Sequence, residues 1–256
     1  MAQLQLRPLG VGEIVDATFT VYRRRFGPMF AIALMLVFIP FLVSLVGGCS
    51  LDSGGITTCT SPIGWLGYYV SVVGSFVASV AAVLVAAGAY ADVPSDWRSA
   101  MNTGIRRIVP IIAATIVAGV LIAIGFLLVI IPGIFLAVSL AVVWEALIIE
   151  DVGPMESIKR SWRLVAGERW RLFGAGFLVI VLSVIFFGIV SAVVWLILST
   201  GLGVSGGMAG YLVQQVATLL SVPLTAALGT VIYLDLRVRK ESLSAAELAA
   251  ALSEQG

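Results

Sequence analysis

Glu145 places a carboxylate inside a long apolar run, about one helical turn before the run ends at Ile149. Charge is costly to bury in lipid, so such a residue is a candidate for carrying a proton or a cation. Its position near the end of the run also allows it to reach water or one of the arginines, and the sequence favours this structural role. Gln214 and Gln215 lie in another apolar run, where hydrogen bonds between helices are favoured over contacts with a substrate.

Two cysteines, Cys49 and Cys59, lie in the segment CSLDSGGITTC between two apolar runs. The short segment contains Gly and Ser and closes easily into a loop, and a disulfide is permitted outside the cytoplasm. The sequence therefore favours a disulfide over two free thiols. No His and no acidic cluster supports a metal site at these cysteines.

Other reactive groups are scarce in this sequence. His is absent, which removes the commonest general base and the commonest metal-ligating side chain. Gly201, Gly203 and Gly206 match the letters of the dinucleotide-binding fingerprint, but they connect two apolar runs and no strand precedes them. We therefore expect no catalytic site, no metal and no cofactor, and we interpret the chain as non-enzymatic.

The elements that carry these residues are long and apolar. Hydrophobic residues occupy 60% of the 256 positions and charged residues only 11%, whereas a soluble domain carries roughly 25% charged residues. A helix needs about 20 predominantly apolar residues to cross a bilayer. The sequence therefore predicts an all-α, polytopic membrane bundle of six transmembrane helices. The six runs are residues 27–48, 63–91, 109–130, 133–149, 172–198 and 210–234.

The runs 109–130 and 133–149 are separated only by Ile131, Pro132 and Gly133. Proline must break helical hydrogen bonding and glycine permits a tight turn, so we expect a hairpin rather than one bent helix. Small residues at four-residue spacing predict close packing between helices. They include Gly74, Ala78, Ala82 and Ala86.

Basic residues are sorted to every second connection between the runs. The 15 Lys and Arg residues cluster before the first run, after the last run and in two of the connections. The connections 49–62, 131–133 and 199–209 contain none. Because Lys and Arg are retained in the cytoplasm, this pattern predicts a multi-pass protein with both termini cytoplasmic. We expect no cleaved signal peptide, one membrane domain at 1–240 and a short cytoplasmic tail at 241–256.

The segments ahead of the first, third and fifth runs share one plan, in which an amphipathic stretch and a basic cluster precede the run. We therefore expect three units, each an amphipathic cytoplasmic helix followed by a transmembrane hairpin. Basic faces beside an apolar stripe suit an anionic membrane surface, where each Lys or Arg contributes about 1 kcal/mol. These helices either bind lipid headgroups or a protein partner, or only anchor the loops. The predicted contact residues are Arg24, Arg25, Arg106, Arg107, Arg160, Arg163 and Arg169.

Three cytoplasmic segments carry a resemblance to a known family. They read RPLGVGEIVDATFTVYRRRFGPMF at 7–30, IIEDVGPMESIKRSWRLVAGERWRLFGAGF at 148–177 and VIYLDLRVRKESL at 231–243. These segments resemble the membrane domain of bacterial glycerophosphoryl diester phosphodiesterases, which implies a membrane module of the bacterial cytoplasmic (inner) membrane. The hydrolytic activity of those enzymes belongs to a separate barrel domain with His and acidic metal ligands. Since this chain contains no His, the resemblance does not imply that activity.

The sequence as a whole predicts a non-enzymatic integral membrane protein, a scaffold or accessory module for envelope or lipid-related proteins. The repeated plan of the cytoplasmic segments and the missing catalytic groups motivate this prediction. The expected partners are membrane lipids and other membrane proteins, and a net charge of +1 favours no nucleic acid. The alternative is a carrier or channel for a small or lipid-like substrate, suggested by the repeated hairpins and by Glu145.

Overall fold

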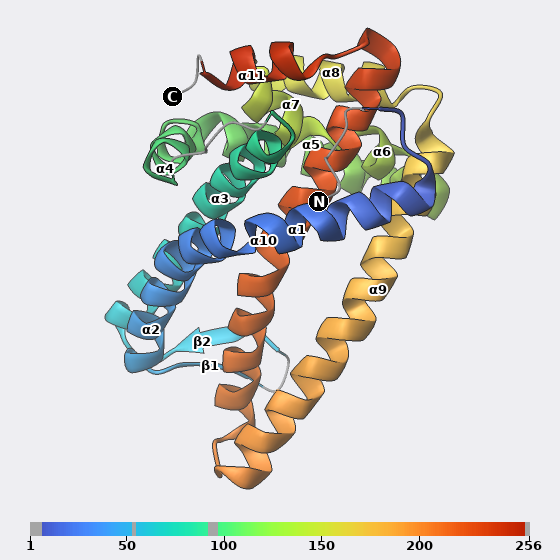
Figure 1. Ribbon diagram of the computed structural model, residues 1–256. Coiled ribbons are helices and arrows are strands. Elements are labelled where there is room, and N and C mark those ends of the chain that lie inside the picture. Colours follow the sequence, from blue (N-terminus) through green and yellow to red (C-terminus); the bar gives the residue numbers. More distant parts are fainter. Residues whose placement is uncertain (1–6, 53–54, 92–96, 254–256) are drawn as a thin grey trace.

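The computed structural model describes residues 7–52, 55–91 and 97–253. Helices form a bundle with one small two-stranded sheet (Figure 1). Within these residues, six helical segments are long and apolar enough to cross a membrane, so the chain is a membrane-embedded, all-α protein. These segments are Val11–Val46, Pro62–Tyr90, Ile108–Leu128, Ile130–Ile149, Arg169–Gly201 and Gly206–Glu241.

The individual elements follow one another along the chain with short connections. The first part contains α1 (Val11–Ala33), the π-helical η1 (Leu34–Phe38), α2 (Ile39–Val46), β1 (Cys49–Leu51), β2 (Thr57–Cys59) and α3 (Pro62–Ala91). The middle contains α4 (Trp97–Arg106), α5 (Ile108–Leu128), α6 (Ile130–Ser139), α7 (Val143–Ile149) and α8 (Pro154–Val165). The last part contains α9 (Arg169–Leu196), the π-helical η2 (Ile197–Gly201), α10 (Gly206–Glu241) and α11 (Ala245–Ser253).

Helix α1 joins the amphipathic stretch and the start of the first apolar run in one bent helix. The bend lies at Arg25, where φ is −111° and ψ is 15°. Pro28 lies three residues further on, lacks an N–H, and crowds the carbonyl of Arg24, so the helical hydrogen bonds open here. Figure 1 shows the first part of α1 running sideways before the chain turns along the bundle into α2.

Small side chains allow α3 to pack in the middle of the bundle. Ala78, Ala82 and Ala86 are buried, as their spacing predicts. At Gly74 an added Cβ would overlap the carbonyl oxygen of Leu36 in η1, so glycine permits a close approach of the two backbones. One apolar core extends from α3 to α1, α7 and α10.

The predicted C-terminal tail, residues 241–256, contributes to this core. It includes α11, whose Leu248 is fully buried, and Leu243 before the helix is also buried. These two leucines form part of the apolar core that includes α3. The tail is therefore a packed element over its described length, while residues 254–256 lie outside the described residues.

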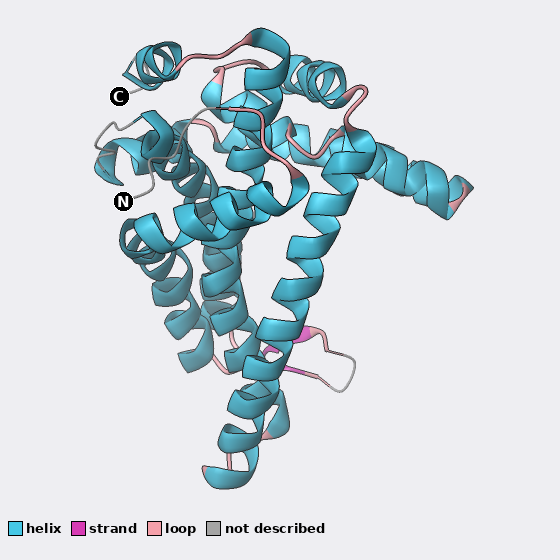
Figure 2. Ribbon diagram, turned by 45° about the vertical axis from the view of Figure 1, so that its right-hand side comes forward, coloured by secondary structure: helices cyan, strands magenta, loops and turns pink. Residues whose placement is uncertain are grey.

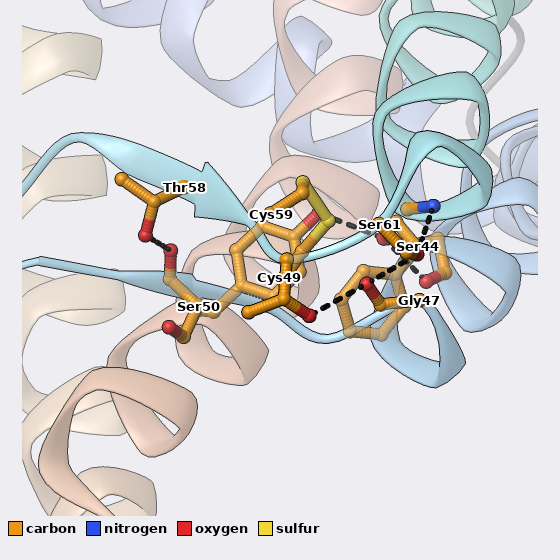
Figure 3. The surroundings of a disulfide bond; sticks show 11 residues. Ser44, Gly47, Cys49, Ser50, Thr58, Cys59 and Ser61 are labelled. Atoms are coloured by element: carbon orange, nitrogen blue, oxygen red, sulfur yellow. Dashed lines mark hydrogen bonds between the residues drawn. A yellow bond between two sulfur atoms is a disulfide. The ribbon is translucent and has the colours of Figure 1, made fainter.

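The β-hairpin is closed by a disulfide between Cys49 and Cys59 (Figure 3). The two residues are paired directly across the antiparallel strands β1 and β2. Cys49 is buried in a small cluster with Tyr211 of α10, and the Tyr211 hydroxyl lies 2.8 Å from Ser44 Oγ of α2. The hairpin is thus held between α2 and α10.

Replacing Cys49 and Cys59 with serine is expected to lower the free energy of unfolding by about 2–3 kcal/mol, because the opened loop regains entropy in the unfolded chain. Thermal unfolding of the purified double variant in detergent, compared with the parent protein, measures this effect. The parent protein under reducing conditions should behave like the variant. If neither change lowers the unfolding temperature, the disulfide does not stabilise the fold.

Helices α5 and α6 fold back on one another, but their turn lies earlier than the sequence predicts. Helix α5 ends at Leu128, and Val129 is extended, with φ −164° and ψ 155°. Helix α6 then begins at Ile130, so the turn predicted at residues 131–133 is displaced toward the N-terminus. Pro132 lies in the first turn of α6, where a helix tolerates a missing N–H because that donor has no intrahelical partner.

The predicted run 133–149 also divides into two helices. Helix α6 ends at Ser139 and α7 begins at Val143, with a turn between them. Figure 2 shows the α5–α6 hairpin projecting sideways, across the direction of α9 and α10. The orientation of this hairpin therefore differs from that of α9 and α10.

Candidate functional site

A cavity of about 800 Å³ lies between α3, α5, α6, α7, α9 and α10. This volume is within the range of small-molecule sites, roughly 300–1,000 Å³. Glycines keep the space open, because an added Cβ at Gly119 or Gly176 would meet nothing within 4 Å. The walls are mainly apolar, and their polar side chains include Ser79, Thr115, Glu145 and Thr225.

Glu145 supplies the carboxyl group of this cavity from the first turn of α7. The residue is only 6% exposed, and its Oε2 has no hydrogen-bond partner among the described residues. The hydroxyls of Ser79, Thr115 and Thr225 each donate to a carbonyl oxygen of their own helix. These three hydroxyl groups therefore do not donate a hydrogen bond to the Glu145 carboxyl group. The sequence favoured a structural role in which Glu145 reaches water or an arginine, and no ion pair between Glu145 and an arginine occurs among the described residues.

Gly229 of α10 makes room for the Glu145 carboxyl group. A Cβ at Gly229 would overlap Glu145 Oε1, so a side chain at this position would displace the carboxyl group or separate α7 from α10. Glycine is required here by contact and not by backbone conformation, since Gly229 lies inside a regular helix. The sequence signal for this contact is weak because residues 145 and 229 are far apart in the chain.

The cavity has the chemistry of a site for an amphiphile with a hydrogen-bond donor. A buried polar group without a partner is unfavourable in an apolar medium, and a ligand N–H or O–H could donate to the carboxyl group of Glu145, which lines the cavity. A protonated amine would also provide the opposite charge for the carboxylate. The apolar body of such a ligand would contact walls that include Ile122, Val138 and Ile180.

The two glutamines predicted as polar groups of the membrane interior lie away from this cavity. Gln215 is buried in α10, and Gln214 beside it is exposed. Neither side chain lines the cavity. They are thus separate from Glu145, with which the sequence grouped them.

The arginines predicted to contact headgroups or partners fall into two groups. Arg107, Arg160 and Arg169 make internal contacts: Arg107 pairs with Asp151, Arg160 with Glu150 and Glu241, and Arg169 donates to Ser139 Oγ. Arg163 pairs with Glu156 at an exposed position. Arg24 and Arg106 are exposed, and Arg25 at the bend of α1 is half-buried.

A buried ionic network surrounds Asp235 near the end of α10. Its carboxylate accepts from the Leu9 backbone N–H at 2.7 Å, from Arg171 at 2.5 Å and from Arg239 at 3.2 Å. Arg171 and Arg239 also donate to the Leu9 carbonyl oxygen. The contacts of Asp235 with Leu9 and Arg171 join residues far apart in the chain, so no local sequence pattern predicts them.

A second ionic network joins α8 to α10 through Arg160. Its guanidinium donates to Glu241 at 2.6 Å and to Glu150 at 2.8 Å, and Tyr233 Oη also donates to Glu150. The hydrogen bonds to Glu241 and Glu150 raise the pKa of the Arg160 guanidinium above its ordinary value. These side chains hold the ends of helices together, and the cavity walls include none of them.

One comparison with known proteins identifies a family for this chain. A family model described as "Domain of unknown function (DUF7847)" matches residues 27–236. The chain belongs to this family. No curated protein and no solved structure matches the chain. The matched region contains every residue that lines the cavity, together with Asp235, and it leaves out Leu9.

Substitution of Gly229 by alanine is expected to destabilise the protein by about 1–3 kcal/mol, because the added methyl group overlaps the Glu145 carboxyl group. Thermal unfolding in detergent measures the loss. The matched control is Gly188→Ala in α9, where an added Cβ meets nothing within 4 Å and alanine is the better helix former. Equal unfolding temperatures of the two variants would contradict the close contact between α7 and α10.

Proposed function

We propose that this protein is a membrane carrier that binds a lipid-like substrate with a hydrogen-bond donor, such as a long-chain amine, in the cavity beside Glu145. The observation that carries the proposal is the buried carboxyl group of Glu145, whose Oε2 has no partner in the described part of the chain, on the wall of an apolar cavity of about 800 Å³. Buried ionisable groups in membrane segments are retained mainly at sites of substrate or ion binding. A scaffold would have no need of this cavity or of this carboxyl group.

The arginine contacts favour a carrier over a scaffold that docks partners through its basic helices. Arg107, Arg160 and Arg169 contact other parts of the same chain and so are less available to a second protein. Surface arginines such as Arg106 and Arg163 suit anionic headgroups, which attract basic residues at the membrane surface. These arginines would bind headgroups at the membrane surface but would not determine which substrate the carrier binds.

The proposal retains the topology that the basic residues predict. Both termini and α8 would face the cytoplasm, and the disulfide hairpin would face the opposite side, where a disulfide is stable. The bend in α1, the moderately polar α4 and α8, and their basic residues support three amphipathic helices at the cytoplasmic surface. The bacterial inner membrane and the kinship with phosphodiesterase membrane domains rest on sequence resemblance alone.

A binding experiment with a pyrene-labelled long-chain amine tests the proposed site. The protein is placed in lipid nanodiscs, and energy transfer from its tryptophans, which include Trp144 on the cavity wall, to pyrene is measured. We expect saturable binding by the parent protein. Gly176→Phe fills the cavity from α9, so it should weaken binding at least about tenfold, the loss expected when roughly 1.4 kcal/mol is removed.

The matched control for this experiment is Gly188→Phe, which adds the same ring to α9 at an exposed position outside the cavity. Its affinity for the amine should equal that of the parent protein. In sealed vesicles, the parent protein should also accelerate movement of the probe between leaflets, and Gly176→Phe should not. Equal binding by the two phenylalanine variants would exclude the cavity as the site.

A further inference from the structure

The apolar α5–α6 hairpin runs across α9 and α10 and not along them. Figure 2 shows the hairpin as an arm that projects sideways from the upper part of the bundle. The sequence predicts that the runs 109–130 and 133–149, which contain most of α5 and α6, cross the membrane, because both runs are long and apolar. Length and composition do not determine the direction of a helix in the membrane. The contacts of α5 and α6 with the other helices indicate how deep the hairpin lies in the bilayer.

The turn of the hairpin lies at the same end of the bundle as α8 and the start of α9, and so at the same depth in the membrane. Ile131, next to the turn, lines a hollow of about 360 Å³ together with Gly167 and Trp170. Phe135 packs its ring 5.7 Å from that of Trp162 in α8, and the Arg169 guanidinium lies 4.6 Å from the centre of the Phe135 ring. A transmembrane hairpin would instead bring its turn to the other end of α9.

The rest of α6 stays at this depth. Ser161 of α8 donates to the carbonyl oxygen of Ser139 at 2.9 Å, and Arg169 donates to the Ser139 hydroxyl at the same distance. Contacts with the α8 end of the bundle therefore occur at both the first and the last turns of α6. A helix with both ends at one depth lies along the membrane surface.

The surface around the turn is apolar and open. Residues 120–131 contain no polar side chain, and Leu127 and Ile131 are 86% and 76% exposed. Trp170 beside them is 85% exposed, and an amphipathic ring is favoured at the boundary between hydrocarbon and headgroups. Acyl chains of the leaflet on the α8 side suit this surface, since residues 120–131 offer no polar side chain to water or to a polar partner.

We propose that the α5–α6 hairpin does not cross the bilayer and lies within the leaflet on the α8 side, where its exposed residues contact acyl chains. The crossing segments are then four: Val11–Val46, Pro62–Tyr90, Arg169–Gly201 and Gly206–Glu241. The distribution of basic residues agrees with this arrangement as well as with six crossings. Both flanks of the hairpin are basic, and they lie on one side of the membrane in either case.

Distances between spin labels in lipid nanodiscs decide between the two arrangements. One label is placed at Ile131→Cys and the second at either Lys159→Cys in α8 or Ser205→Cys before α10, all of which are exposed. The native cysteines are joined to each other and do not react. The pair Lys159→Cys and Ser205→Cys calibrates the separation between the two ends, about 30 Å or more across the hydrocarbon.

We expect the Ile131 label to lie closer to residue 159 than to residue 205. The reverse order would overturn the proposal, because it would place the turn on the opposite side of the membrane. Leu127→Cys provides a second label position on the exposed surface of the hairpin if the Ile131 variant folds poorly. Neither result depends on whether the cavity binds an amine, so this experiment and the test of the proposed function can fail independently.

The same Ile131 label tests what covers the hairpin. Contact with acyl chains predicts that lipid-dissolved oxygen relaxes the label strongly and that a water-soluble nickel complex does not. Relaxation by the nickel complex would place the turn in water, and protection from both reagents would show that protein covers it. Either of these last two results would overturn the proposed lipid contact.

Discussion

Asp235→Ala is expected to produce the largest loss of stability, about 3–5 kcal/mol, which is typical when one partner of a buried ion pair is removed. The Asp235 side chain is fully buried and pairs with Arg171 and Arg239. Without the carboxylate, Arg239 loses its acidic partner, Arg171 retains only its pair with Glu168, and the Leu9 backbone N–H loses its acceptor. Thermal unfolding and the fraction of monodisperse protein in detergent measure the effect.

The matched control for Asp235 is Glu156→Ala, which removes the carboxylate of an exposed pair with Arg163. Solvent screens that pair, so the expected loss is within about 1 kcal/mol. Asp235→Asn retains an oxygen acceptor for Leu9 but no charge and should fall between the two alanine variants. If Asp235→Ala unfolds at the temperature of the Glu156 control, the buried network does not hold the N-terminal segment to α9 and α10.

Glu145→Gln is expected to remove the preference of the cavity for an amine. A hydrogen bond to a charged group contributes about 1.5–3 kcal/mol, which corresponds to roughly a 10- to 100-fold change in affinity. Glutamine keeps the size of the side chain, so the apolar contacts of the ligand should persist. The measurement is the ratio of dissociation constants for the pyrene-labelled amine and the matching alcohol.

The comparison variant for Glu145 is Thr115→Val, which also changes a polar side chain of the cavity wall. The Thr115 hydroxyl donates to the Ile111 carbonyl oxygen of its own helix, so its removal should leave the ratio nearly unchanged. An unchanged ratio in Glu145→Gln, with amine binding intact, would mean that the carboxyl group does not contact the ligand. The cavity would then bind the probe through its apolar walls alone.

The number and approximate limits of the apolar helices could be predicted because each depends on a continuous stretch of chain. Six runs of sufficient hydrophobicity appear in the sequence, and six such helical segments appear in the structure. The close packing at Ala78, Ala82 and Ala86 follows in the same way from their four-residue spacing. The link between Cys49 and Cys59 also joins neighbouring parts of the chain.

The candidate site could be predicted only in part. Glu145 was recognisable as a carboxylate in an apolar run, but its lack of an arginine partner and the cavity beside it were not. The overlap that a Cβ at Gly229 would cause could not be foreseen, since the two residues lie on different helices. The same applies to Asp235, whose backbone partner Leu9 is 226 positions away.

Sequence by itself determined which segments are helical, apolar or basic, because hydrophobicity, helix propensity and charge belong to individual residues and their near neighbours. The tertiary structure alone decided where those helices point and what they enclose. The sideways course of α5 and α6, the space around Glu145 and the burial of Asp235 arise from contacts between segments distant in the chain. Such contacts depend on the shapes of two or more packed surfaces, which no single stretch of sequence contains.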